Sequence, residues 1–273
     1  YTINGGAPQT VTTITGNSTI VTAPTATPGT FTYSLVSVQD ASPASCNQAQ
    51  TGTAVVTVNP LPTATISGTT TVCQNAPAPQ VTFTGSGGTA PYTFRYTVNA
   101  SPAQTVTTVS GNSVTVPAPT TATGNFVYTL LSVTDASSTA CSQPQTGTVI
   151  ISVNPLPTAT IAGTTEVCMN TTAPLISFTG ASSSNPYIFY YRINGGPLLN
   201  VISTGNTATV PVPTAVPGTF TYTLESVTDG STTSCSQTQT GSATVIVHPL
   251  PTSAFTNSNP QCPQQSTVPL FPG

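Results

Sequence analysis

A proline-bounded phrase recurs along this 273-residue chain and determines the length of its repeating unit. The phrase reads VNPLPTAT at residues 58–65 and 153–160, and VHPLPTSA at residues 247–254. Its first proline is Pro60, Pro155 or Pro249, so successive copies lie 95 and 94 residues apart. This period is too long for a solenoid repeat and is typical of a β-sandwich domain of about 100 residues.

Other segments keep the same spacing. GTTTVCQNAPAPQVTFTG at 68–85 matches GTTEVCMNTTAPLISFTG at 163–180. PGTFTYSLVSVQD at 28–40 returns as TGNFVYTLLSVTD at 123–135 and as PGTFTYTLESVTD at 217–229. These matches predict four modules: the C-terminal part of one at 1–59, complete modules at 62–153 and 157–247, and the N-terminal part of another at 252–273.

Short runs in which apolar and polar residues alternate predict the strands of each module. Turn residues rich in Gly, Pro and Asn separate these runs, and no segment has a helical period. The predicted fold class is therefore all-β, with tandem immunoglobulin-like β-sandwich domains in an elongated array. In the module at 62–153 the expected strands are 63–67 and 70–73 (a split first strand), 80–85, 92–99, 104–109, 112–118, 125–134 and 147–153.

The longest of these strands contains a change of phase. Phe31, Tyr33 and Leu35 alternate onto one face, and the apolar residues then shift by one position. The same shift at Leu131 predicts a β-bulge. In the third copy Glu225 occupies the shifted position, so we expect its side chain to face solvent.

The composition excludes several classes of function. Only 3% of the residues are charged, and the two Lys/Arg residues cannot form a basic surface, so no nucleic-acid partner is expected. No run approaches 18 apolar residues, so the sequence predicts no membrane-spanning segment. The first residue is Tyr1, which indicates a processed product or a window from a longer chain.

Several of the repeated phrases carry a family resemblance. GTFTYSL followed by V-x-D resembles the penultimate strand of immunoglobulin-like and polycystic-kidney-disease-type sandwich domains, although Trp and their usual Cys pair are missing. PLPTAT, GTTTVC, GGTAPYTF and GTFTYTL…SVTD resemble the tandem repeats of giant secreted surface proteins of Bacteroidetes-type bacteria. These include gliding-motility adhesins exported by the type 9 secretion system. The resemblance covers essentially the whole chain and implies a cell-surface filament without enzymatic activity or cofactor.

The proline phrases are expected to be stiff linkers between modules. Each proline fixes its own φ and favours extended geometry in the residue before it, which gives a semi-rigid polyproline-II spacer. We expect the central leucine of each linker to pack between neighbouring domains and the whole chain to be a rod. The linker residues are Asn59, Pro60, Leu61 and Pro62; Asn154, Pro155, Leu156 and Pro157; and His248, Pro249, Leu250 and Pro251.

Six cysteines occupy two repeat positions and predict disulfides in an oxidising environment. Cys46, Cys141 and Cys235 follow the penultimate strand, whereas Cys73, Cys168 and Cys262 precede the second strand. Three pairing patterns stay open. They are pairing within a module (Cys73–Cys141 and Cys168–Cys235), pairing between neighbouring modules (Cys73–Cys235), and pairing across a linker (Cys46–Cys73). No metal site is expected, because no CxxC-type or His-containing cluster is present.

The candidate functional residues have structural alternatives. Asp40, Asp135 and Asp229 recur once per module, either as calcium ligands between domains or, with more support, as residues that open turns. His248 has no carboxylate close in sequence and is interpreted as a spacer residue.

The aromatic residues of the third strand also have two interpretations, a core or a platform for sugars, and the core is favoured. These residues are Tyr92, Phe94 and Tyr96, with Tyr187, Phe189 and Tyr191 in the next copy.

Three functions are compatible with the sequence. The first is a structural stalk or adhesin filament outside the cell, in contact with an extracellular surface and with neighbouring modules. The second is an array that binds glycans. The third is a fibre in which copies of the chain join head to tail by strand complementation, because the partial modules at the two ends nearly add up to one whole. No catalytic signature is present.

Overall fold

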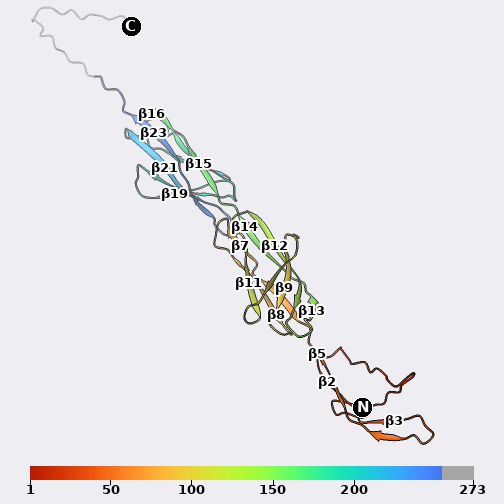
Figure 1. The fold of residues 1–273 in the computed structure, drawn as a ribbon. Helices are drawn as coiled ribbons and strands as arrows, with labels where there is room; N and C mark the ends of the chain where they lie inside the picture. Colours follow the sequence, from red (N-terminus) through yellow and green to blue (C-terminus); the bar gives the residue numbers. More distant parts are fainter. Residues whose placement is uncertain (254–273) are drawn as a thin grey trace, which may run out of the picture. The chain divides into compact units, whose positions relative to one another are not determined.

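The computed structural model describes residues 1–253, and every regular element among them is a β-strand. The chain divides into two compact units, Tyr1–Pro155 and Leu156–Gly273 (Figure 1). Residues 254–273, which make up most of the partial module predicted at 252–273, lie outside the described residues. No helix among the described residues is long and apolar enough to cross a membrane.

The module at 62–153 is a sandwich of two sheets. One sheet has the order β11-β8-β6, and the other has the order β10-β9-β12-β14-β7 with β13 paired to β12. All pairs are antiparallel except β14 with β7, which is parallel. The strands are β6 (Thr63–Ser67), β7 (Thr70–Cys73), β8 (Gln80–Ser86), β9 (Thr93–Val98), β10 (Gln104–Thr107), β11 (Ser113–Pro117), β12 (Gly124–Thr134), β13 (Ser142–Pro144) and β14 (Thr148–Asn154).

The module at 157–247 repeats this topology strand for strand. Its sheets have the orders β15-β17-β20 and β16-β23-β21-β18-β19, with β22 paired to β21. The tandem immunoglobulin-like β-sandwich fold predicted from the sequence is therefore confirmed. The strands are β15 (Thr158–Ala162), β16 (Thr165–Cys168), β17 (Leu175–Ala181), β18 (Ile188–Ile193), β19 (Leu199–Ile202), β20 (Thr207–Pro211), β21 (Gly218–Thr228), β22 (Ser236–Thr238) and β23 (Ser242–His248).

A glycine allows the first strand to divide between the two sheets. β6 pairs with β8 and β7 pairs with β14, so the chain changes sheets between Ser67 and Thr70. Gly68 has φ +122°, and a Cβ atom there would lie 2.5 Å from the backbone oxygen of Gln80. Because side chains rarely adopt this conformation and the space is filled, only glycine suits the position. Gly163 makes the same change of sheet in the next module.

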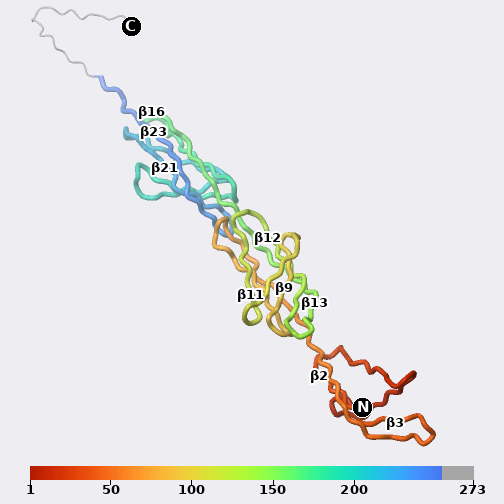
Figure 2. The backbone as a smooth tube through the Cα atoms, in the orientation of Figure 1, coloured from red at the N-terminus to blue at the C-terminus, as the bar shows by residue number. Residues whose placement is uncertain are grey.

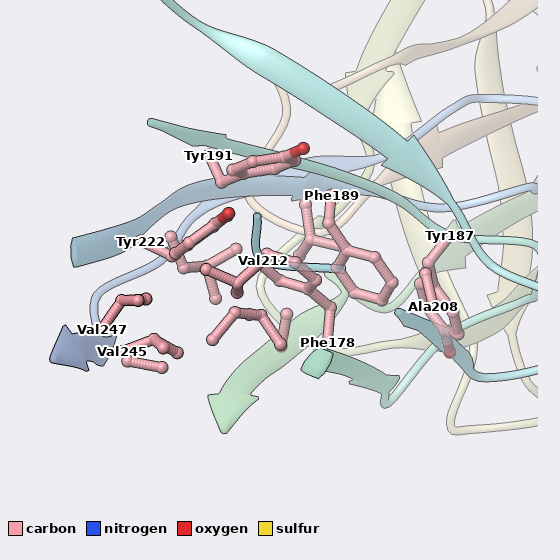
Figure 3. Close-up of a cluster of buried hydrophobic side chains, with 14 residues drawn as sticks. Phe178, Tyr187, Phe189, Tyr191, Ala208, Val212, Tyr222, Val245 and Val247 are labelled. Atoms are coloured by element: carbon pink, nitrogen blue, oxygen red, sulfur yellow. The ribbon is translucent and has the colours of Figure 1, made fainter. Parts of the chain in front are cut away.

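Aromatic and branched side chains fill the space between the sheets. In the module at 157–247 the ring centroids of Phe178 and Phe189 lie 5.6 Å apart, and those of Phe178 and Tyr191 lie 5.1 Å apart (Figure 3). These spacings suit offset or tilted ring packing. The core cluster of this module consists of Ala159, Ile176, Phe178, Tyr187, Phe189, Tyr191, Ala208, Val212, Tyr222, Leu224, Val227, Ala243, Val245 and Val247.

The β-bulge predicted in the longest strand is present in both complete modules. The register between β12 and β9 shifts between Leu130 and Ser132, so Leu131 has no partner in the ladder. Glu225 is skipped in the same way between β21 and β18. Its carboxylate lies 3.5 Å from Nε of Arg192, and about 40% of each side chain is exposed. The expected solvent-facing position of Glu225 is confirmed.

Residues 1–58 form one layer of a sandwich. The sheet β1-β2-β5 corresponds to β9, β12 and β14 of the next module, and β3–β4 corresponds to the hairpin after the bulge. Figure 2 shows the long loop that separates β1 from β2. Residues 1–58 contain no counterparts of β6, β7, β8 or β11. The strands are β1 (Thr2–Ile3), β2 (Gly29–Ser34), β3 (Ser37–Gln39), β4 (Asn47–Ala49) and β5 (Thr53–Val58).

Truncating the leucine at one repeat position should have a different effect in the complete module than in residues 1–58. Leu130 is 1% exposed, whereas Leu35 at the same repeat position is 43% exposed. Leu130→Ala should lower the free energy of unfolding by about 2–5 kcal/mol, because it removes buried methyl groups and leaves a cavity. Leu35→Ala should lower it by less than about 1 kcal/mol. Urea denaturation followed by tyrosine fluorescence measures both changes, and equal losses would contradict the difference in burial.

Candidate functional site: the aspartate turn and the module linkers

An aspartate closes the turn that follows the longest strand of the second module. Oδ1 of Asp135 accepts hydrogen bonds from the amide (3.2 Å) and the hydroxyl (2.7 Å) of Ser137. Its Oδ2 accepts a hydrogen bond from the amide of Thr89 at 3.0 Å. The residue is 5% exposed. Both carboxylate oxygens therefore hold the turn and the loop between β8 and β9 together.

The same turn recurs in the other modules. Oδ1 of Asp40 accepts hydrogen bonds from the hydroxyl of Ser42 at 2.7 Å and from the amide of Cys46 at 2.9 Å. Oδ1 of Asp229 accepts the equivalent bonds from Ser231 and Cys235, at 2.6 and 2.9 Å. The turn is thus a D-x-S-x-x-x-C motif. The aspartate was expected to open a turn, but the role of the serine two residues later was missed, although that serine recurs in every copy.

These hydrogen bonds control the ionisation of the aspartates. Burial of Asp135 raises its pKa, but the Ser137 hydroxyl and the amides of Thr89, Ser137 and Cys141 outweigh burial and hold the pKa below its ordinary value. The hydroxyl of Ser42 is the largest cause of the lowered pKa of Asp40. Both carboxylates are therefore charged at neutral pH.

The structure provides no cluster for the calcium that was considered at these aspartates. Within residues 1–253, no three His, Cys, Asp or Glu side chains lie close enough together to hold a metal ion. Calcium usually takes six to eight oxygen ligands. Oδ1 of each aspartate instead accepts hydrogen bonds from its own turn.

The aromatic residues of the third strand lie in the core. Tyr92 is 2% exposed, and its hydroxyl donates to the backbone oxygen of Gly88 at 2.8 Å. Tyr187 is 1% exposed, and its hydroxyl donates to the backbone oxygen of Ser183 at 2.6 Å. A buried ring cannot stack on a sugar, so the core interpretation is confirmed for these residues.

A shallow pocket of about 320 Å³ lies between β19 and β20 in the module at 157–247. Its lining offers hydroxyl groups and methyl groups but no titratable side chain. An acid–base mechanism needs such a group within reach of the substrate. The lining residues are Val201, Ile202, Thr204, Thr207, Ala208 and Thr209.

The first linker makes a contact that was not predicted from the sequence. Nδ2 of Asn59 donates to Oγ1 of Thr139 at 2.9 Å, which ties the end of β5 to the aspartate turn of the second module. The prediction that Leu61 packs between domains is wrong, because Leu61 is 57% exposed and Pro62 is buried instead. Side chains alternate along extended backbone, so an inward Pro62 and Ala64 place Leu61 outward. Leu250 is also exposed, at 48%.

His248 has a carboxylate partner, contrary to its interpretation as an unpaired spacer residue. Its Nε2 lies 2.8 Å from Oε2 of Glu166. The two residues are 82 positions apart and meet because β16 pairs in parallel with β23. Both side chains are more than half exposed, so the pair adds little to stability.

The cysteines are in two different states. Cys73 and Cys235 are disulfide-bonded, whereas Cys46, Cys141 and Cys168 carry free thiols. The predicted pairings Cys73–Cys141, Cys168–Cys235 and Cys46–Cys73 are therefore wrong, since each requires one of the free thiols. The pairing Cys73–Cys235 stays a prediction, and Cys262 lies outside the described residues.

Replacing the turn aspartate should remove part of the acid sensitivity of folding. A carboxylate with a lowered pKa stabilises the fold at neutral pH, and this stabilisation is lost as the pH falls below the ordinary value of about 3.9. Asp135→Asn should therefore lower the free energy of unfolding at pH 7 by about 1–3 kcal/mol, because an amide cannot accept at both positions.

The same variant should then lose less stability than the unmodified chain on acidification, as measured by urea denaturation at several pH values. Glu225→Gln is the matched control, because it removes a half-exposed carboxylate and should leave the acid dependence nearly unchanged. An Asp135→Asn chain with the stability and pH profile of the unmodified chain would contradict the role given to this carboxylate.

Comparisons with known proteins give structural likeness at low identity. No protein-family model and no curated protein matches the sequence. One similar structure is a Ca²⁺-stabilised adhesin that helps an Antarctic bacterium reach out and bind ice. It is 17% identical over 80% of this chain, with a TM-score of 0.43, and the match spans 56% of that adhesin chain.

Two further structures have scores in the same range. A 1.5-MDa bacterial ice-binding adhesin is 16% identical, with 81% of this chain and 74% of that chain covered and a TM-score of 0.41. Immunoglobulin domains I67–I69 of titin are 9% identical, with 84% and 77% covered and a TM-score of 0.43.

Proposed function

We propose that the chain is a structural repeat segment of a bacterial cell-surface adhesin or filament, and that it acts as a stiff, non-catalytic stalk outside the cell. The observation that carries this proposal is the tandem repetition of one strand order in modules joined by linkers with two prolines. Polar side chains that recur among the described modules, such as the turn aspartates and serines, bond to each other. What the modules share is therefore structural.

The first linker supports the stiffness in this proposal. Pro60 and Pro62 restrict the backbone to extended geometry. The hydrogen bond from Asn59 to Thr139 holds one end of the linker against the second module. A linker that is both short and bonded to its neighbour allows less bending than a Gly/Ser-rich segment of the same length.

The location outside the cell is supported by the disulfide-bonded state of Cys73 and Cys235, because disulfides persist in oxidising environments. The resemblance to gliding-motility adhesins gives the finer form of the proposal. In that form the segment is exported by a type 9 secretion system and supports adhesion or gliding of a Bacteroidetes-type bacterium.

Small-angle X-ray scattering tests the stalk directly. The unmodified chain should give the distance distribution of an elongated, stiff particle. Replacing Pro60, Pro62, Pro155 and Pro157 with glycine should shift the profile toward that of a flexible chain of beads.

The control is replacement of Pro28 and Pro43, two exposed prolines outside the linkers, which should leave the profile unchanged. A compact particle, or linker variants that scatter like the unmodified chain, would overturn the proposal.

A further inference from the structure

One sheet edge in the module at 157–247 is apolar and exposed. β19 is the last strand of its sheet, and among residues 1–253 no strand pairs with its other edge. Leu198, directly before β19, is 50% exposed, and within the strand Leu199 and Ile202 are 37% and 61% exposed. No charged residue stands between Arg192 and Glu225, and β19 contains no proline. The edge therefore lacks the charges and prolines that commonly protect an edge strand from pairing.

The equivalent edge of the preceding module is polar. β10 occupies the place of β19 in the module at 62–153, which has the same topology. The fold therefore does not require large apolar side chains on this edge, and their presence distinguishes one module from the repeat. The residues at the positions of Leu198, Leu199 and Ile202 are Ala103, Gln104 and Thr107.

The pocket between β19 and β20 lies beside this edge. Val201, Ile202 and Ala208 supply its apolar lining. The position of Ala208 holds the larger Val114 in the preceding module. The alanine therefore leaves room for an apolar side chain that comes from outside the module.

The backbone groups that face the free edge belong to alternate residues of β19. The amide of Ser203 donates to the backbone oxygen of Tyr187, which precedes β18, at 2.8 Å. This pair continues the register of β19 with β18. Because hydrogen-bonded and non-hydrogen-bonded pairs alternate along an antiparallel ladder, the amides and oxygens of Asn200 and Ile202 point away from β18. They are available to another strand.

The side chains of β19 alternate between the two faces of the sheet. Val201 pairs with Phe189 of the core and packs against the core cluster, so Val201 and Leu199 lie on the inner face. Asn200 and Ile202 lie on the outer face. The strand thus has an apolar residue on each face, on either side of Asn200.

We propose that this edge binds the same edge of a second copy of the chain, with the two β19 strands antiparallel about a two-fold axis at Asn200. In this register each Asn200 lies opposite the other. Leu198 lies opposite Ile202 on the outer face. Leu199 lies opposite Val201 on the inner face, beside the pocket. Each exposed apolar side chain then contacts another, and the backbone groups at the edge form hydrogen bonds between the copies.

The chemistry of the edge favours a second copy over a charged partner. A charged peptide or surface would meet no opposite charge on this edge. The strand, in contrast, matches itself at every position of the proposed register. The interface is isologous, so pairing uses the edge of both copies and stops at the dimer. This inference goes beyond the stalk proposal and does not depend on it.

Sedimentation velocity of the full chain tests the inference, with the free thiols alkylated so that no disulfide joins the copies. The mass of the unmodified chain should increase with concentration from monomer to dimer and no further. Ile202→Lys places a charge at an exposed position of the edge, so the module should fold and the chain should stay monomeric. Thr107→Lys is the matched control, because it makes the same change on the polar edge of the preceding module. It should dimerise like the unmodified chain.

Substitutions at the two-fold axis test the register. Asn200→Asp and Asn200→Lys each place like charges opposite one another, so each variant alone should dimerise several-fold more weakly than the unmodified chain. An equal mixture of the two variants places opposite charges at the axis and should form mixed dimers more tightly than either variant alone.

Several results would overturn the inference. The unmodified chain could stay monomeric at every concentration or grow beyond dimers. Ile202→Lys could dimerise normally, or Thr107→Lys could fail to dimerise. A mixture of the Asn200 variants that associates no more tightly than either variant alone would contradict the proposed register and the two-fold pairing with it.

Discussion

Face-to-face packing of two sheets around an aromatic core is the interaction on which the rest of the structure depends. Burial of apolar surface is worth about 25 cal/mol per Å², and an aromatic side chain buries about 150–250 Å². The two ion pairs within residues 1–253 are both largely exposed and add little. With 3% charged residues, the fold relies on its cores and on the hydrogen bonds of its ladders and turns.

In residues 1–58 the structure describes the strands of one sheet only, so this part of the chain can be compared with the two-layered modules. The long strand keeps its pairing with β5, since backbone hydrogen bonds within one sheet need no second layer. Its bulge region separates into the short ribbon β3–β4, and apolar side chains that are buried in the other modules are exposed. The aspartate turn is retained, because the hydrogen bonds that the Asp40 carboxylate accepts all come from Ser42 and Cys46 of the same turn. Local turns therefore form without a core, whereas burial requires the complete module.

Much of the fold could be predicted because its signals are local. Period-two alternation located the strands of the second module, and the phase change at Leu131 revealed the bulge. β13 was missed because its three residues, Ser142–Pro144, include no branched or aromatic side chain and are too few to show alternation. The outward position of Leu61 was missed because composition does not indicate which side of an extended segment faces the core.

The site depended more on contacts between distant residues, and less of it could be predicted. The pair of His248 with Glu166 and the bond of Asn59 to Thr139 join residues about 80 positions apart, and both follow from strand placement that sequence spacing does not reveal. The states of the cysteines could not be predicted either, since the same repeat position holds a free thiol at Cys141 and a disulfide-bonded cysteine at Cys235.

Hydrogen exchange measured by mass spectrometry tests the central claim most directly, because it compares the same repeat position in three settings. Amides in 124–134 and 218–228 should exchange slowly, since their opening requires separation of the two sheets. The equivalent amides in 29–39 should exchange orders of magnitude faster. Equal protection at all three positions would contradict the claim that coverage by a second sheet stabilises these modules.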